Sequence, residues 1–93
     1  MSKNPDTQLA PLQVRNLSQL GKGESAIVIG LAETVDAEQG AIRARLLELG
    51  FAPGERLRVV ATSFPGGDPM AVRIGNTMFA LRRREAEMIH VML

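Results

Sequence analysis

One stretch of the sequence, residues 45–60, reads RLLELGFAPGERLRVV and specifies the end of a helix, a turn and a strand in succession. Leu46 and Leu49 continue a spacing that begins at Ile42, and this pattern is typical of a helix with one buried face. Gly50 stands where a helix end requires a residue that can adopt positive φ. The pattern therefore predicts a helix that ends at Gly50.

The residues that follow Gly50 predict a turn and then a strand. Pro53 fixes φ at the first central position of a type II turn, and Gly54 permits the positive φ of the second position. Leu57 and Val59 then alternate with other residues, as in a half-buried strand. We therefore expect the chain to turn at Pro53 and Gly54 between the helix and the strand.

The beginning of the helix has a signal of its own. Asp36 is followed three residues later by Gln39, and this pair is typical of a helix N-cap and its reciprocal partner. We therefore expect the helix to cover residues 37–49, with one buried face.

Five segments show the alternation of a strand, and turn-forming residues separate them. They are residues 25–32, 55–64, 70–74, 77–81 and 89–93, with residues 83–87 long enough for one helical turn before the last strand. The pattern predicts a mainly β fold, a small barrel of about five strands with one inserted α-helix. The residues expected in its core are Ile27, Ile29, Ile42, Leu46, Leu49, Leu57, Val59, Val72, Ile74, Phe79, Leu81, Ile89 and Val91.

The length of 93 residues is enough for one domain with a single core. We assign residues 1–14 to a flexible tail, because they are largely polar, carry two prolines and show no period, and residues 15–93 to the folded domain. The chain has no cysteine and shows neither a secretory signal nor a long apolar run. We expect a cytoplasmic protein without direct membrane insertion.

The charge balance argues against a nucleic-acid partner. Eleven basic and ten acidic residues leave a net charge of +1, which gives no long-range attraction for nucleic acid. Arg82, Arg83 and Arg84 are adjacent, but Glu85 follows at once and the chain has no Tyr or Trp to stack on bases. We interpret this cluster as a solvated turn whose arginines pair with nearby glutamates.

Three segments, in the right order, resemble one known family. The segment RLLELGFAPG at residues 45–54 resembles the central motif of the ferrous-iron transport protein A (FeoA) family. The segments LSQLGKGE at residues 17–24 and FALRRREA at residues 79–86 resemble its opening and its closing motifs. The resemblance implies an SH3-like barrel and the role of an accessory or regulatory protein in ferrous-iron uptake.

Neither a catalytic site nor a complete metal site is expected. With one histidine and no cysteine, the chain lacks the nucleophile and base pairing of covalent catalysis, so we do not expect an enzyme. Met88, His90 and Met92 would share one face of the last strand, as a soft metal site requires. No second histidine completes this shell, so we expect no required cofactor and only weak binding of Fe2+ or another divalent transition metal.

The end of the helix is the candidate partner-binding surface. Leu47 lies off the buried stripe, and Phe51 and Ala52 follow the helix end, so these three residues are the expected contact. The family resemblance implies that the partner is the cytosolic GTPase domain of a FeoB-type membrane permease. Three alternatives remain: contact with a second copy of the chain, an SH3-like regulatory role beside an iron-dependent repressor, and weak metal binding.

Overall fold

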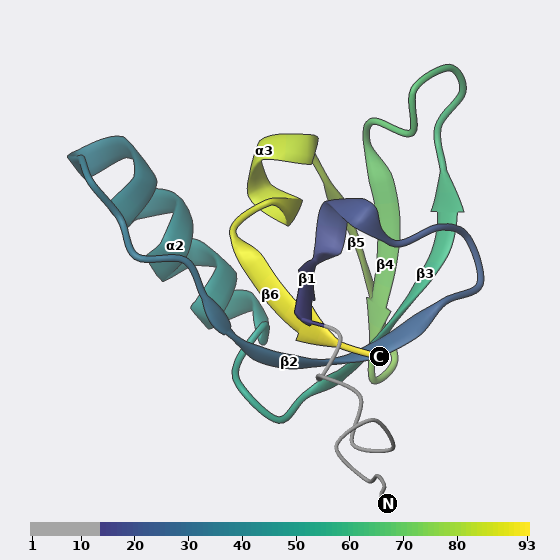
Figure 1. Cartoon of the computed structure of the whole chain (residues 1–93), viewed down its shortest axis with the longest axis horizontal. Coiled ribbons are helices and arrows are strands. Elements are labelled where there is room, and N and C mark those ends of the chain that lie inside the picture. The colour runs from purple at the N-terminus through teal and green to yellow at the C-terminus, as the bar shows by residue number, and fades with distance from the viewer. Residues whose placement is uncertain (1–13) are drawn as a thin grey trace, which may run out of the picture.

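The structure, a computed structural model, describes residues 14–93 and is drawn in Figure 1. The predicted tail at residues 1–13 lies outside the described residues. The strands are β1 (Val14–Asn16), β2 (Ser25–Leu31), β3 (Arg56–Thr62), β4 (Met70–Ile74), β5 (Thr77–Leu81) and β6 (Ile89–Met92). The helices are the 3-10 turn η1 (Leu17–Gln19), the helix α2 (Ala37–Leu49) and the short helix α3 (Arg83–Ala86).

All six strands belong to one antiparallel sheet in the order β1-β6-β2-β3-β4-β5. The sheet curls on itself, and helix α2 stands at one side of it, with its first turn pointing away from the strands (Figure 1). The prediction of a mainly β fold with one inserted helix and a helical turn before the last strand is confirmed. No helix among residues 14–93 combines the length and the apolar character needed to cross a membrane.

The first strand is the element that the sequence did not indicate. Val14 lies opposite Met92 and Asn16 lies opposite His90, so β1 adds a sixth strand beside β6. The strand therefore already includes Val14, the last residue that we assigned to the tail. A strand of three residues is too short to show an alternating period, which explains why the pattern missed it.

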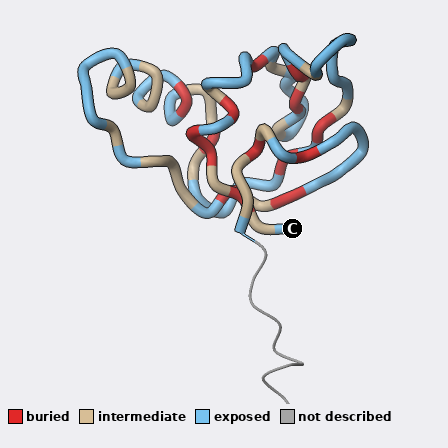
Figure 2. The backbone as a smooth tube through the Cα atoms, turned by 45° about the horizontal axis from the view of Figure 1, so that its top comes forward, coloured by how far each residue is buried: buried red, intermediate tan, exposed pale blue. Residues whose placement is uncertain are grey.

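The core lies inside the curl of the sheet, and helix α2, which projects to one side, contributes only the fully buried Leu46 to it (Figure 2). Seven of the residues predicted in the core are fully buried there: Leu46, Leu57, Val59, Val72, Leu81, Ile89 and Val91. Four more predicted core residues are partly buried and pack against it: Ile42, Leu49, Ile74 and Phe79. The apolar pattern of the helix and of strands β3 to β6 therefore predicted the correct inward faces.

The prediction for strand β2 was wrong in the first half of the strand, where the other face is buried. Ala26 and Val28 lie in the core, whereas Ile29 is 40% exposed and Ile27 is half-buried outside it. The register gives the reason: Ile27 lies opposite Arg56, and directly opposed residues share one face of a sheet. Because the Arg56 guanidinium remains in solvent, Ile27 lies on the outer face as well.

Helix α2 begins and ends as its sequence predicts. The Asp36 side chain accepts a hydrogen bond of 2.8 Å from the Gln39 N–H, and the Gln39 side chain accepts one of 3.0 Å from the Val35 N–H. At the other end, Gly50 has a φ of +112°, which the sequence required of it. These two ends fix the helix at residues 37–49.

Candidate functional site

The candidate site is built around the last turn of helix α2, where the chain leaves the helix through Gly50. The N–H of Gly50 donates to the Leu47 carbonyl at 3.1 Å, and the N–H of Phe51 donates to the Leu46 carbonyl at 3.0 Å. These bonds satisfy carbonyl groups that a helix end otherwise leaves unpaired. The following turn is also formed as predicted, with Gly54 at a φ of +93°.

Phe51 does not belong to the docking surface, which corrects the prediction. Its side chain is fully buried, and its ring centroid lies 5.4 Å from that of Phe79. An apolar residue just after a helix cap commonly packs back onto the last turn, and here it continues into the core. Phe51 therefore anchors the end of α2 to the barrel and leaves the surface to its neighbours.

The other two predicted contact residues are accessible. Leu47 is 37% exposed, although Leu46 beside it is fully buried, and Ala52 is half-buried just beyond the helix end. Residues three and four positions apart on a helix share a face, so Leu47 shares its face with Arg43 and Ala44. The sequence analysis missed these two residues, although their spacing from Leu47 was sufficient to find them. We call Arg43, Ala44, Leu47 and Ala52 the helix-end surface.

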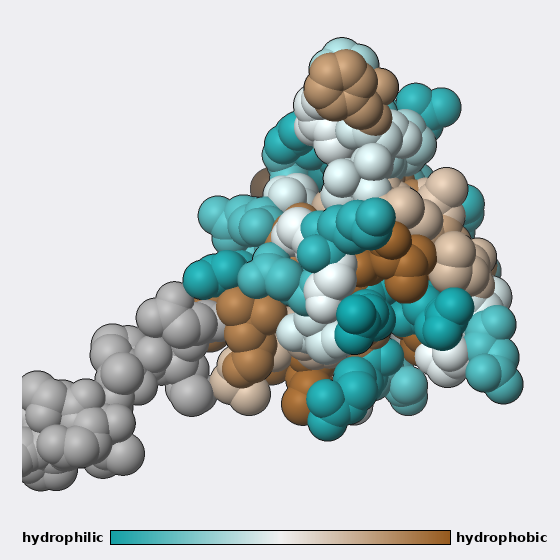
Figure 3. All heavy atoms as spheres, turned by 90° about the vertical axis from the view of Figure 1, so that its right-hand side faces the viewer, coloured by the Kyte–Doolittle hydropathy of each residue, from teal (hydrophilic) through white to brown (hydrophobic). Residues whose placement is uncertain are grey.

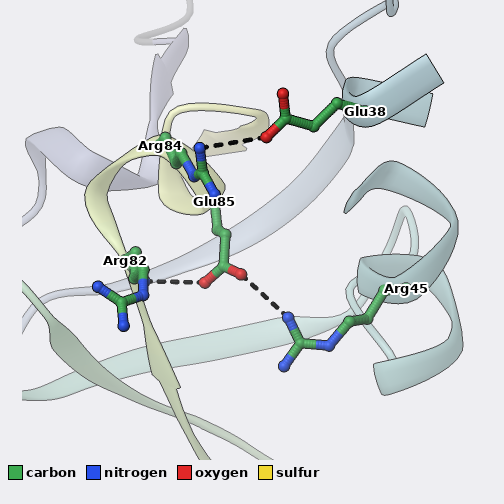
Figure 4. A network of polar contacts seen from close by, with 5 residues as sticks. All are labelled: Glu38, Arg45, Arg82, Arg84 and Glu85. Atoms are coloured by element: carbon green, nitrogen blue, oxygen red, sulfur yellow. Dashed lines mark hydrogen bonds and ion pairs between the residues drawn. The ribbon is translucent and has the colours of Figure 1, made fainter. Parts of the chain in front are cut away.

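Ion pairs hold a different side of α2 against α3 (Figure 4). The Arg45 guanidinium lies 2.9 Å from a Glu85 carboxylate oxygen, and the other Glu85 oxygen accepts a hydrogen bond of 2.9 Å from the Arg82 N–H. Arg84 lies 3.4 Å from Glu38, with both side chains about two-thirds exposed. The first contact is the stronger one, because the Glu85 side chain is only 13% exposed and has two donors.

These pairs correct one interpretation of the sequence. The arginines of the 82–84 cluster were expected to pair with glutamates in the same turn, but the side-chain ion pairs of α3 reach across to helix α2. Arg83 instead points to the loop between β3 and β4, where its guanidinium donates to the Gly66 carbonyl at 2.8 Å. The cluster therefore connects α3 with two other parts of the barrel.

A hollow of about 360 Å³ lies between α2 and α3. Its lining combines apolar side chains, among them Ile42 and Met88, with charged ones, among them Asp36, Arg84 and Glu87. Its walls are the two helices that the ion pairs connect. The hollow and the helix-end surface thus lie on different sides of α2, because Leu47 is off the stripe that carries Ile42.

The three residues predicted as a weak metal site do not come together. Met88 is not in the last strand: it lies in the turn before β6, its side chain is only 8% exposed, and it belongs to the core. His90 and Met92 are half-buried and share the outer face of β6, since they alternate with the buried Ile89 and Val91. Within residues 14–93, no three His, Cys, Asp or Glu side chains are grouped as metal ligands.

The comparisons with known proteins agree on one family. The family described as FeoA domain matches residues 15–93 of the chain. A relative from Porphyromonas gingivalis, described as a fusion of Fe(2+) transport protein A with the Fe(2+) transporter FeoB, is 35% identical over 77 residues. The match covers 83% of this chain, and the chain spans only 8% of the length of that relative.

Solved structures give the same result for the fold. The crystal structure of FeoA from Stenotrophomonas maltophilia complexed with zinc, described as an SH3 domain protein, is 42% identical with a TM-score of 0.72. The match covers 82% of this chain and 87% of the other. A manganese-dependent transcriptional repressor is similar with a TM-score of 0.74 at 21% identity, covering 94% of this chain and 45% of the repressor. The SH3-like barrel implied by the sequence resemblance is therefore confirmed.

Proposed function

The chain belongs to the FeoA family, and we propose that it is a cytosolic accessory protein of ferrous-iron uptake that docks on the GTPase domain of a FeoB-type permease. The observation that carries this proposal is the Porphyromonas relative, in which a FeoA part and FeoB share one chain. Covalent linkage holds two modules at a high effective concentration, which is useful when the modules act on each other. We propose that the FeoA domain of the present chain acts on the same kind of partner by docking.

The helix-end surface fits a docking role better than a catalytic one. It offers an accessible leucine on a helix that Phe51 and the ion pairs hold in one orientation. Complete burial of the remaining accessible part of Leu47 would contribute about 0.5–1 kcal/mol, which is a modest share of a binding free energy. We expect the chain to regulate the permease and to catalyse no reaction of its own.

Measurement of binding between the purified chain and the cytosolic domain of the permease tests the proposal. We expect Leu47→Asp to raise the dissociation constant about tenfold or more, because docking would bury an unpaired carboxylate. Val35→Asp is the matched control, since Val35 is 85% exposed and lies before the other end of the same helix. A thermal unfolding curve for each variant shows that the fold is retained.

Two outcomes would contradict the proposal in different ways. Absence of binding by the wild-type chain at every accessible concentration would remove the permease as its partner. Equal binding by the wild type, Leu47→Asp and Val35→Asp would remove the helix-end surface and keep the partner. Capture of an iron-dependent repressor in place of the permease would favour the regulatory alternative.

Weak binding of a divalent transition metal is a second role, favoured by the zinc in the Stenotrophomonas structure. His90 and Met92 supply one imidazole and one thioether, so they do not form a tight site within a single chain. If two copies share a site, the melting temperature should rise with the concentration of Zn2+ or Fe2+. The variant His90→Ala should not show this rise. An unchanged melting temperature over a saturating metal series would remove this role.

A further inference from the structure

Two arginines face each other directly on the neighbouring strands β3 and β4. Arg58 on β3 lies opposite Arg73 on β4, and Arg56 lies two residues before Arg58 on the same strand. All three side chains are exposed. Leu57 and Val59, which alternate with the β3 arginines, are buried, so the arginines point out of the barrel. We call Arg56, Arg58 and Arg73 the basic ladder.

The basic ladder has no acidic counterpart in the described chain. The ion pairs among residues 14–93 join Arg45 to Glu85 and Arg84 to Glu38, and neither pair includes a ladder residue. An open hollow of about 220 Å³ beside the ladder is lined by Ser25, Arg56, Leu57, Arg58, Arg73 and Gly75, with no carboxylate among them. The positive charge of this face is therefore available to another molecule.

This arrangement is unfavourable for the isolated chain. Like charges placed directly opposite each other on one face of a sheet destabilise it, and a residue of opposite charge at either position would remove the repulsion. Guanidinium groups also bind carboxylates through two parallel hydrogen bonds, which a single point charge does not do. The Cβ atoms of residues opposite each other in a sheet lie about 5 Å apart, so one segment with two carboxylates can reach Arg58 and Arg73 together.

We propose that the basic ladder binds an acidic segment of the partner protein, one that presents at least two carboxylates to Arg58 and Arg73. This inference rests on the proposed docking to the permease, and it adds a contact that is separate from the helix-end surface. Met78 lies opposite Arg73 and is 51% exposed, so the acidic segment would also meet an apolar side chain at the edge of the sheet. Charge complementarity gives this contact its orientation and an association rate that depends on salt.

The same face is poorly suited to nucleic acid. Bases stack on aromatic rings, but Phe51 is buried, Phe79 is half-buried, and Phe64 lies in the loop after β3, at the opposite end of that strand from Arg56 and Arg58. Hydrophilic and apolar residues are also interleaved on the side of the molecule that carries β3 (Figure 3). Three arginines in a chain of net charge +1 give a local contact and no broad basic surface.

Binding of the full chain to the cytosolic domain of the permease, measured at several salt concentrations, tests the inference. We expect the double variant Arg58→Gln/Arg73→Gln to raise the dissociation constant about tenfold, and to bind with a weaker dependence on salt between about 0.05 and 0.3 M. The double variant Lys22→Gln/Arg82→Gln removes the same charge from two other exposed positions that take part in neither ion pair of α2, and it should bind within about threefold of the wild type.

Each outcome has a defined meaning. Equal binding by the two double variants and the wild type would overturn the basic ladder and leave the permease as the partner. Absence of wild-type binding would overturn the proposed function and this inference together. In parallel titrations with phosphatidylcholine–phosphatidylserine vesicles and with a DNA duplex, we expect no contribution from Arg58 or Arg73. Tight binding to either probe that the ladder variant loses would overturn the assignment to an acidic protein segment.

Discussion

The rings of Phe51 and Phe79 lie with their centroids 5.4 Å apart and their planes tilted by 57°. Phe51 follows the cap of helix α2, and Phe79 belongs to β5, an edge strand of the sheet. Their contact therefore joins the end of helix α2 to an edge strand of the sheet. It also fixes the end of α2 on which the helix-end surface depends.

Phe51→Ala should destabilise the chain by about 3–5 kcal/mol, because it removes a fully buried aromatic side chain and leaves a cavity. Chemical denaturation followed by circular dichroism measures this change in the free energy of unfolding. Phe64→Ala is the control, since Phe64 is 97% exposed, and it should change stability by less than about 0.5 kcal/mol. Similar effects of the two variants would contradict the assignment of Phe51 to the core.

Gly50→Ala should destabilise the chain by about 1–2 kcal/mol, because a φ of +112° is strained for any residue with a Cβ atom. The space around Gly50 is open, so the cost comes from the backbone alone. Gly30→Ala provides the comparison: Gly30 also has open space around it, but its φ is not positive, and the variant should be neutral or slightly stabilising. Gly50→Ala should therefore have a lower melting temperature than Gly30→Ala.

Glu85→Ala should cost about 1–2 kcal/mol of stability, because it leaves the Arg82 N–H without its acceptor and removes the partner of Arg45. Glu38→Ala should cost less than about 0.5 kcal/mol, since its contact with Arg84 is long and exposed. Equilibrium unfolding of the two variants tests this order. If Glu38→Ala proves the more damaging change, α3 does not hold the helix in the way described.

Arg73→Gln should stabilise the isolated chain by about 0.2–1 kcal/mol, because it removes the repulsion from Arg58. Unfolding at low salt gives the most sensitive measurement, since added salt screens the repulsion in the wild type. A gain in stability together with a loss of partner binding would separate the binding role of the arginine from any structural role. A loss of stability beyond about 1 kcal/mol would show that Arg73 supports the sheet.

Residues 37–49 show why much of the fold was predictable from sequence. Its N-cap pair, its apolar stripe and its terminal glycine are local signals, and the backbone geometry at each end depends on them directly. The turn at Gly54 was predictable for the same reason. These features require no knowledge of the residues that pack against them.

Strand β2 shows where local signals fail. Both of its faces are apolar, and the choice between them depends on the pairing of Ile27 with Arg56, which is a long-range fact of the sheet. The basic ladder was missed for a related reason. Arg58 and Arg73 are far apart in the sequence, and only the register brings them opposite each other. Met88 was misplaced because the chain turns there and enters β6 one residue later.

The pairing of Val14 with Met92 brings the two ends of the described chain together, because β1 and β6 are antiparallel neighbours. A short hairpin linker could therefore join Leu93 to Val14 without moving either strand. The chain could then be opened in the exposed loop between β3 and β4. Such a circular permutant would keep every pair of neighbouring strands in the sheet. Its new ends would lie beside Phe64, in a loop that strand β3 separates from helix α2 along the sequence.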